Sequence, residues 1–198
     1  MTTDVICFFD FDGTITDRDS LPDFIQYAVG KPAYYLGLLV LSPMLLSYLL
    51  KITPNDVAKE KILAHYFTGW AQDRFEDIAR RYSLERIPDI IRPEARERLR
   101  WHQQQNHEIV VVSASMKNWL EPWCRQTGVK LLSTQLEISG GRLSGRFATP
   151  NCHGKEKVNR ISKRFDLESY TFIYAYGDSS GDTEMLALAN EAQYKPFR

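Results

Sequence analysis

Cysteine is scarce in this sequence. Only Cys7, Cys124 and Cys152 occur among the 198 residues, far apart and without a Cys-x-x-Cys pair. This spacing argues against a disulfide framework and against a cysteine-based zinc site. Scattered, unpaired thiols are typical of a reducing compartment, and the first residues show no basic segment of the kind that begins a signal peptide. We therefore expect a cytoplasmic protein.

An excess of charge of either sign is also absent. Lys and Arg total 25, Asp and Glu total 25, and the formal net charge is zero. A nucleic-acid-binding domain is usually basic, so we expect no nucleic-acid partner. The four histidines show no ligand spacing. The length suits one domain with an insertion, and the oligomeric state is left open by these features.

Short apolar runs alternate with helical patterns through much of the chain. Strands are predicted over residues 5–9, 109–113, 130–133 and 172–177, and helices over 93–105, 117–127, 155–165 and 183–189. This alternation predicts an α/β fold with a Rossmann-like parallel sheet flanked by helices. Between residues 134 and 147 the apolar period changes to two around Gly140-Gly141, which predicts a small inserted β-hairpin.

Residues 17–92 interrupt the alternation and have a helical pattern throughout. Helices are predicted over 21–29, 34–50, 54–67 and 73–82, with Thr53 as the N-cap of the third. An insertion after the first strand would cover the carboxyl end of the sheet. We therefore divide the chain into a catalytic core of residues 1–16 and 93–198 and a helical cap of residues 17–92.

One part of the predicted cap carries no charge. The segment from Pro32 to Leu50, between Lys31 and Lys51, is long enough to cross a bilayer. A crossing would separate two halves of one predicted site, and Ser42-Pro43 should break the helix into pieces too short to span. We favour a packed pair of cap helices. The alternative is a helix in the membrane interface, which would give the cap a peripheral membrane contact.

Acidic residues follow two of the predicted strands. Asp10 and Asp12 follow the run Val5–Phe9, and Asp178 and Asp182 follow the run Phe172–Tyr176. In open α/β sheets, ligands bind at the carboxyl ends of the strands. Carboxylates gathered there are unfavourable without a cation, and oxygen ligands suit Mg²⁺. The sequence therefore predicts a magnesium site between these strand ends.

Three segments together resemble the motifs of the haloacid dehalogenase (HAD) superfamily of phosphatases. Residues 10–14 (DFDGT) resemble its first motif, residues 110–115 (VVVSAS) look like its second, and residues 177–182 (GDSSGD) look like its fourth. The large helical insertion is similar to that of the C1-capped branch, which includes phosphoserine phosphatase. Residues 14–20 and 154–158 look closest to subfamily IB of that branch. The resemblance covers the whole chain.

The resemblance implies a role for each acidic residue. Asp10 would be the nucleophile that forms an aspartyl-phosphate, and Asp12 would protonate the leaving alcohol and then deprotonate water. Mg²⁺ would be held by Asp10 and Asp178, by the backbone carbonyl of Asp12, and by Asp182 directly or through water.

The resemblance also implies a phosphate-binding set. Thr14, Ser113 and backbone N–H groups nearby, including that of Ala114, would hold phosphoryl oxygens. Residues 157–161 match the Lys-x-x-x-apolar pattern of the third motif better than residues 155–159 do, so we prefer Lys157 over Lys155 as the phosphate-binding lysine. Asp19 stands where phosphoserine phosphatases carry a glutamate that meets the substrate amine, although its side chain is shorter.

These features predict a Mg²⁺-dependent hydrolase of phosphoric monoester bonds, acting on a small-molecule phosphomonoester. Three alternatives stay open. The apolar cap segment resembles that of relatives acting on phosphatidylglycerophosphate, which suggests a lipid-phosphate phosphatase at a membrane surface. The family branch suggests a phosphoserine phosphatase. A non-catalytic phosphate-binding module is the third alternative, although such modules usually lose the nucleophile.

Overall fold

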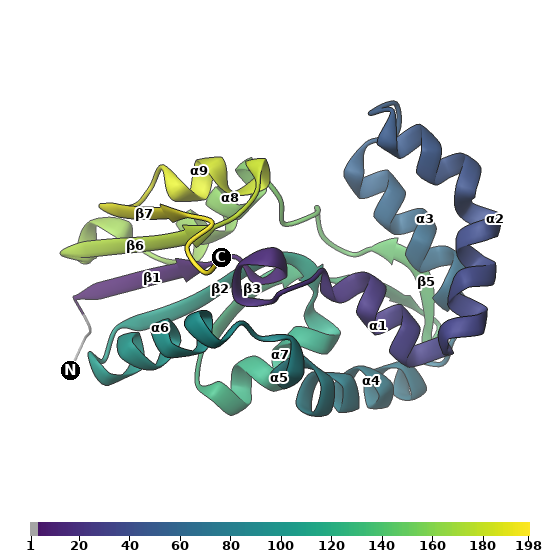
Figure 1. Ribbon diagram of the computed structural model, residues 1–198, viewed down its shortest axis with the longest axis horizontal. Coiled ribbons are helices and arrows are strands. Elements are labelled where there is room, and N and C mark those ends of the chain that lie inside the picture. The colour runs from purple at the N-terminus through teal and green to yellow at the C-terminus, as the bar shows by residue number, and fades with distance from the viewer. Residues whose placement is uncertain (1–3) are drawn as a thin grey trace.

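The computed structural model describes residues 4–198 and has a central parallel sheet of five strands in the order β3-β2-β1-β6-β7 (Figure 1). The strands are β1 Val5–Phe9, β2 Glu108–Met116, β3 Lys130–Thr134, β6 Phe172–Gly177 and β7 Glu191–Tyr194. β1 lies in the middle and pairs in parallel with β2 and β6. The predicted Rossmann-like sheet is confirmed. The edge strand β7 is short and mostly exposed, so its sequence lacks the apolar run that predicts the others.

Helices cover both faces of the sheet, and the alternation of side chains along β1 explains why (Figure 1). Cys7 and Phe9 pack in one apolar cluster with residues of α6 Pro93–Gln104 and α7 Lys117–Thr127. Ile6 and Phe8 pack in a second cluster with residues of α8 Lys155–Arg164 and α9 Thr183–Leu186. Because every second residue faces the other layer, a strand covered on both faces needs an unbroken apolar run.

The predicted hairpin is confirmed. Strands β4 Leu136–Ser139 and β5 Arg142–Phe147 pair antiparallel as a separate two-stranded sheet. Beyond the core the hairpin contacts the cap, since the N–H of Gly69 donates to the carbonyl of Leu143 at 2.9 Å. A second contact joins the side chain of Glu60 to the N–H of Phe147 at 2.7 Å. The hairpin therefore supports the cap from the side of the core.

The helical insertion consists of α1 Ser20–Val29, α2 Lys31–Leu49, α3 Asn55–Phe67, α4 Gln72–Arg81 and the short α5 Ile87–Ile90. The insertion leaves and returns to the core where Thr16 bridges Ile91. Phe24 of α1 stacks on Trp119 of α7 with 4.5 Å between ring centroids. Cap and core thus share one apolar cluster. The division at residues 16 and 93 into separate units stays a prediction.

Two local predictions in the cap are wrong. Pro54, not Thr53, is the N-cap of α3, because the hydroxyl of Thr53 pairs with that of Ser47 at 2.8 Å. The break at Ser42-Pro43 does not occur, and α2 runs through Pro43 as one helix. Proline cannot donate to the carbonyl four residues earlier, that of Leu39, but the Ser42 hydroxyl donates to it at 2.7 Å.

The preferred interpretation of the uncharged segment as packed cap core is also wrong. Of the residues of α2, Gly37 alone is buried. Gly37 lies so close to Tyr66 of α3 that an added Cβ would be 2.3 Å from the tyrosine oxygen, so the helix approaches α3 closely on one side. On the other side its leucines are exposed, Leu39 by 70% and Leu49 by 73%. Composition alone does not distinguish an apolar helix that is buried from one that is exposed.

Candidate active site

Two loops at the carboxyl end of the sheet carry the acidic residues. Asp10 directly follows β1, and Asp178 directly follows β6. The N–H of Asp10 donates to the carbonyl of Tyr176 at 2.9 Å, so the pairing of the two strands continues up to the first carboxylate. Parallel strands end at one edge of the sheet, and acidic residues far apart in the chain therefore meet there.

Gly13 lets the first loop turn against the second. Its φ is +80°, and a Cβ at this position would lie 2.6 Å from an Asp178 oxygen. Any other residue would be strained and would collide with that carboxylate. The hydroxyl of Thr14 lies next, 3.2 Å from Asp10 Oδ2 and 3.4 Å from Asp178 Oδ1. Thr14 is buried and joins the two carboxylates.

Lys157 lies buried between two carboxylates. Its Nζ is 2.5 Å from Asp10 Oδ1 and 2.6 Å from Asp182 Oδ1. Burial acts to lower the pKa of Lys157, but Asp10 and Asp182 outweigh it and raise the pKa, so the ammonium stays charged. Lys155, the alternative phosphate-binding lysine, is exposed on the same helix. The first turn of α8 therefore brings Lys157, and not Lys155, into the acidic cluster.

Asp182 is held rigidly from both of its oxygens. While Oδ1 contacts Lys157, Oδ2 accepts from the N–H groups of Asp178 and Ser179 at 3.1 and 3.0 Å and from the Ser179 hydroxyl at 2.9 Å. Burial acts to raise its pKa, but Lys157 and these donors outweigh burial and lower the pKa. Burial raises the pKa of Asp10, with Lys157 opposing and Asp182 adding to the shift. The site therefore holds more carboxylates than Lys157 alone neutralises.

The side chain of Asp12 is oriented by hydroxyl and amide donors. Asp12 Oδ1 accepts from the N–H of Ser20 at 2.7 Å, and Oδ2 accepts from the hydroxyl of Ser115 at 2.5 Å. Ser113, predicted to hold a phosphoryl oxygen, is fully buried, and its hydroxyl lies 3.5 Å from Asp12 Oδ2. The same hydroxyl accepts from the N–H of Ser115 at 3.0 Å. Ser115, which the sequence analysis did not single out, is therefore the closer partner of Asp12.

The carboxylates fit a divalent cation. Asp10, Asp178 and Asp182 each offer an oxygen, and these three atoms lie within 4.8 Å of one another. The guanidinium of Arg198 lies 2.5 Å from Asp178 Oδ2, which shows that this carboxylate accepts a cationic partner. All-oxygen donors of this kind suit Mg²⁺. The side-chain carboxylate of Asp12 is not in this group. Metal binding by the backbone carbonyl of Asp12 stays a prediction.

A pocket of about 450 Å³ opens over these residues, between core and cap. On the core side Asp10, Asp12, Ala114, Lys157 and Asp178 line it. The pocket therefore contains most of the predicted site residues, including Asp182, whereas Thr14 and Ser113 lie behind its wall.

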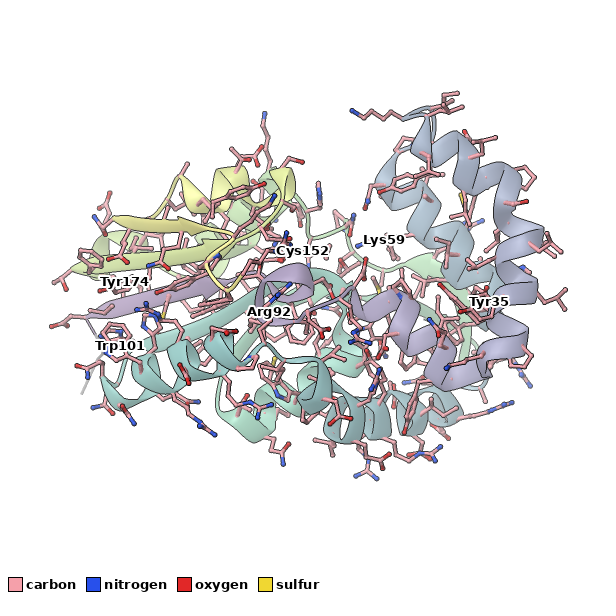
Figure 2. All side chains as sticks on the ribbon, in the orientation of Figure 1. Tyr35, Lys59, Arg92, Trp101, Cys152 and Tyr174 are labelled. Atoms are coloured by element: carbon pink, nitrogen blue, oxygen red, sulfur yellow. The ribbon has the colours of Figure 1, made fainter. Side chains whose placement is uncertain are left out.

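The cap contributes Asp19, Tyr48, Asn55 and Lys59 to the same pocket. Lys59 points from α3 toward the core (Figure 2). Asp19 is also the N-cap of α1, where Oδ1 accepts from the N–H of Leu21 at 3.0 Å. Burial and the Asp12 charge raise the pKa of Asp19 to about 6, with Lys59 opposing. No local sequence pattern marks Tyr48, Asn55 or Lys59, because only the packing of the cap places them over the carboxylates.

Comparisons with known proteins find relatives that match most of this chain. Protein CicA of Caulobacter vibrioides is 35% identical over 192 residues, covering 96% of this chain and 85% of CicA. A probable phosphatase of Mycobacterium tuberculosis is 28% identical over 202 residues, covering 93% of this chain and 66% of that protein.

Solved structures share the fold. A Bordetella pertussis protein of unknown function has a TM-score of 0.81 at 20% identity, covering 96% of this chain and 89% of its own. A phosphoserine phosphatase, solved as a phospho-aspartyl intermediate analogue, has a TM-score of 0.67 at 14% identity, covering 97% and 86%. The family model of haloacid dehalogenase-like hydrolases matches residues 7–187. With its carboxylates gathered over the ends of β1 and β6, the chain belongs to the haloacid dehalogenase-like hydrolase family.

Proposed function

We propose that this protein is a Mg²⁺-dependent phosphatase that hydrolyses a phosphomonoester through an aspartyl-phosphate on Asp10. The observation that carries the proposal is that Asp10 and Asp12 line one pocket with Lys157, each carboxylate held by different partners. A phosphate dianion repels an approaching carboxylate, so the nucleophile must be oriented beside a positive charge. Lys157 supplies that charge at 2.5 Å from Asp10.

In the first step a carboxylate oxygen of Asp10 attacks phosphorus. The new bond joins this oxygen to phosphorus, and the ester oxygen leaves with the electron pair of the broken P–O bond. Asp12, protonated at this stage, gives its proton to that oxygen, so that a neutral alcohol departs. The Ser20 N–H and the Ser115 hydroxyl keep the Asp12 carboxyl in place for this transfer.

In the second step water attacks the phosphorus of the aspartyl-phosphate. Asp12, now a carboxylate, takes a proton from the water, the bond between phosphorus and the Asp10 oxygen breaks, and inorganic phosphate is released. The chain regains the carboxylate of Asp10 and the acid form of Asp12. Bound Mg²⁺, held by Asp10, Asp178 and Asp182, would offset the negative charge of the phosphoryl oxygens.

The test compares Asp10→Asn with the wild type on a soluble aryl phosphate in the presence of Mg²⁺. Asparagine keeps the shape of the side chain and removes the attacking charge, so the rate should fall by at least about a thousandfold. Asp12→Asn should slow formation of the aspartyl-phosphate from alkyl esters more than from aryl esters, because a good leaving group needs no proton. An Asp10→Asn protein with wild-type activity would contradict the proposal.

The two other interpretations have weaker support. A phosphoserine phosphatase needs an acid to meet the substrate amine, and Asp19, the predicted acid, has one oxygen engaged as the N-cap of α1. A non-catalytic phosphate-binding module needs no proton donor. Asp12 nevertheless lines the pocket, and hydrogen bonds to both of its oxygens fix the orientation of its carboxyl group. Phosphoserine belongs in the substrate screen as a direct comparison with aryl, sugar and lipid phosphates.

A second candidate narrows the substrate to a lipid phosphomonoester. The observation that favours it is the position of Tyr48, which belongs to the exposed apolar helix α2 and also lines the catalytic pocket. We place this activity in the reducing cytoplasm, a proposal supported by the absence of a disulfide among the three free thiols Cys7, Cys124 and Cys152. Comparing hydrolysis of a short-chain phosphatidic acid with that of glycerol phosphate tests the preference.

A further inference from the structure

The outward face of α2 is apolar except for Ser42, whose hydroxyl donates to the carbonyl of Leu39 at 2.7 Å. Leu39 and Leu49 expose more than two thirds of their surface, 70% and 73%, and Ile52 beyond the helix exposes 72%. The other large exposed apolar side chains of this face, which we call the α2 face, are Tyr35, Leu36, Val40, Leu46 and Leu50. Single exposed leucines are normal on a soluble protein, but a contiguous patch of this kind marks an interaction site.

The composition of α2 differs from that of an ordinary surface helix. The side facing α3 is already packed, because Tyr66 of α3 donates to the carbonyl of Tyr34 at 2.6 Å and lies against Gly37. A helix packed on one side normally presents charged residues on the other. Here no charge occurs between Lys31 and Lys51, so the side facing solvent is as apolar as the packed side.

The α2 face does not fit a membrane crossing. By length and composition α2 is long and apolar enough to span a bilayer. Its 19 residues extend about 28 Å. The packed side, however, lies against α1 and α3, and α3 carries Asp56, Lys59, Glu60 and Lys61. A crossing would either strip α2 from these helices or take the charges of α3 into hydrocarbon.

The geometry of the patch favours a fluid surface over a protein partner. The large apolar side chains of the α2 face stand at positions 35, 36, 39, 40, 46 and 49 of the helix and at its C-cap, residue 50, which on a helical projection spread over about half of the circumference. A flat protein face would cover only part of such a convex ridge, whereas lipid chains surround it. Tyr35 lies on α2 at the edge of the molecule (Figure 2), and tyrosines favour the boundary between lipid and water.

Charge at the two ends of the helix points to anionic lipid. Lys31 and Lys51 are both exposed and bracket the α2 face. Each lysine near an anionic surface adds to binding, while its aliphatic stem follows the apolar side chains beside it. A helix lying flat with a lysine at each end and leucines between them has the features of an interfacial anchor.

We propose that α2 docks the protein onto an anionic phospholipid surface, lying in the interface plane with the α2 face inserted among the lipids. Tyr48, near the end of α2, lines the catalytic pocket together with Asn55 and Lys59 of α3, so the docked helix and the pocket belong to the same cap. Docking itself is independent of catalysis. Delivery of a lipid phosphomonoester to Asp10 rests on the proposed function.

The test is co-sedimentation with vesicles of phosphatidylcholine, with and without phosphatidylglycerol. Leu39→Gln/Leu49→Gln removes two leucines of the α2 face, and Leu84→Gln/Tyr194→Gln is the matched control at exposed apolar residues elsewhere. We expect wild type and control to bind phosphatidylglycerol vesicles more tightly than phosphatidylcholine vesicles. The α2 variant should bind at least about tenfold more weakly, because two side chains lose their contact with lipid.

Two further measurements, of stability and of activity, accompany the vesicle binding. Thermal unfolding and aryl phosphate hydrolysis should be unchanged in the α2 variant, since Leu39 and Leu49 are exposed and outside the pocket. Wild-type protein that stays unbound at every lipid composition overturns docking, as does equal binding by the α2 variant. A concentration-dependent dimer that the α2 variant abolishes, without vesicle binding, would assign the face to a second copy. Vesicle binding by a protein inactive on every phosphate would refute the proposed function and leave docking intact.

Discussion

The ammonium of Lys157 lies 2.5 Å from a carboxylate oxygen of Asp10, and both groups are almost completely shielded from solvent. This pair joins the third motif of the sequence to the first, through the start of α8 and the end of β1. Asp182 contacts the same ammonium at 2.6 Å. Lys157 therefore contacts two carboxylates at once, while its single positive charge offsets only one of them.

Lys157→Met should destabilise the protein and inactivate it. The substitution leaves Asp10 and Asp182 buried without their cation, and breaking a buried ion pair typically costs about 3–5 kcal/mol. Urea unfolding at neutral pH in EDTA measures the free energy of unfolding. Lys155→Met is the matched control on the same helix, and its exposed side chain should be dispensable for both stability and activity. Equal effects of the two substitutions would contradict this role for Lys157.

Removal of divalent cations should abolish hydrolysis of a soluble aryl phosphate. Three carboxylates within 4.8 Å of one another carry more negative charge than Lys157 and Arg198 together offset. Activity should return with Mg²⁺ and not with Ca²⁺, because calcium takes more oxygen ligands and can engage both oxygens of Asp10, the proposed nucleophile. Full activity after exhaustive dialysis against EDTA would show that the carboxylates work without a metal.

Lys59→Met should weaken substrate binding more than it slows the chemical step. Lys59 comes from α3 and lines the same pocket as Asp10 and Asp12. Loss of one charged contact with a phosphate should raise KM by about tenfold, with a smaller change in kcat. Lys61→Met, exposed on the same helix, is the control. A fall in kcat at unchanged KM would assign Lys59 to the transition state instead.

His102 should make the stability of the fold depend on pH. Its ring nitrogens lie 2.8 Å from His107 Nδ1 and 2.9 Å from the Tyr176 hydroxyl. Burial, with His107 adding to the effect, lowers the pKa of His102 from 6.5 to about 3. Between these values the unfolded chain binds more protons than the folded one, so stability falls as the pH falls.

The size of the pH effect on stability follows from the lowered pKa of His102. Each pH unit below the unfolded pKa costs about 1.4 kcal/mol, so lowering the pH from about 7 to about 5 should cost about 2 kcal/mol. His102→Gln keeps a polar side chain and removes the titration. The difference in free energy of unfolding between the two pH values should therefore be about 2 kcal/mol smaller in the variant, as measured by urea titration. An identical pH dependence of both proteins would contradict the account of His102.

The core could be predicted because its signals are local. Four of the five sheet strands are apolar runs, and the acidic residues stand directly after β1 and β6. The cap could not be predicted to the same depth. The rule that proline breaks a helix fails at Pro43, because the preceding Ser42 supplies the missing donor to Leu39. An apolar run has the same sequence pattern whether it is buried or exposed. The exposure of α2 could therefore be recognised only once its packing against α1 and α3 was known.

Several site residues lie beyond the reach of sequence motifs. Lys59 enters the pocket only because α3 leans over the strand ends, and Ser115 reaches Asp12 through the irregular end of β2. Arg198 contacts Asp178 only because the chain returns past β7. His102 of α6 and His107, just before β2, are five residues apart and lie near Cys7 of β1, so their pairing follows from the fold and not from a ligand pattern.

Covalent trapping tests the central claim most directly. Asp12→Asn protein, mixed with a radiolabelled aryl phosphate and quenched in acid, should accumulate phosphoenzyme, because an aryl group leaves without a proton whereas water needs a base to attack. Peptide mapping should place the label on Asp10, and Asp10→Asn should abolish it. Label on any other residue, or continued hydrolysis of the ester with no covalent label on the protein, would contradict Asp10 as the nucleophile.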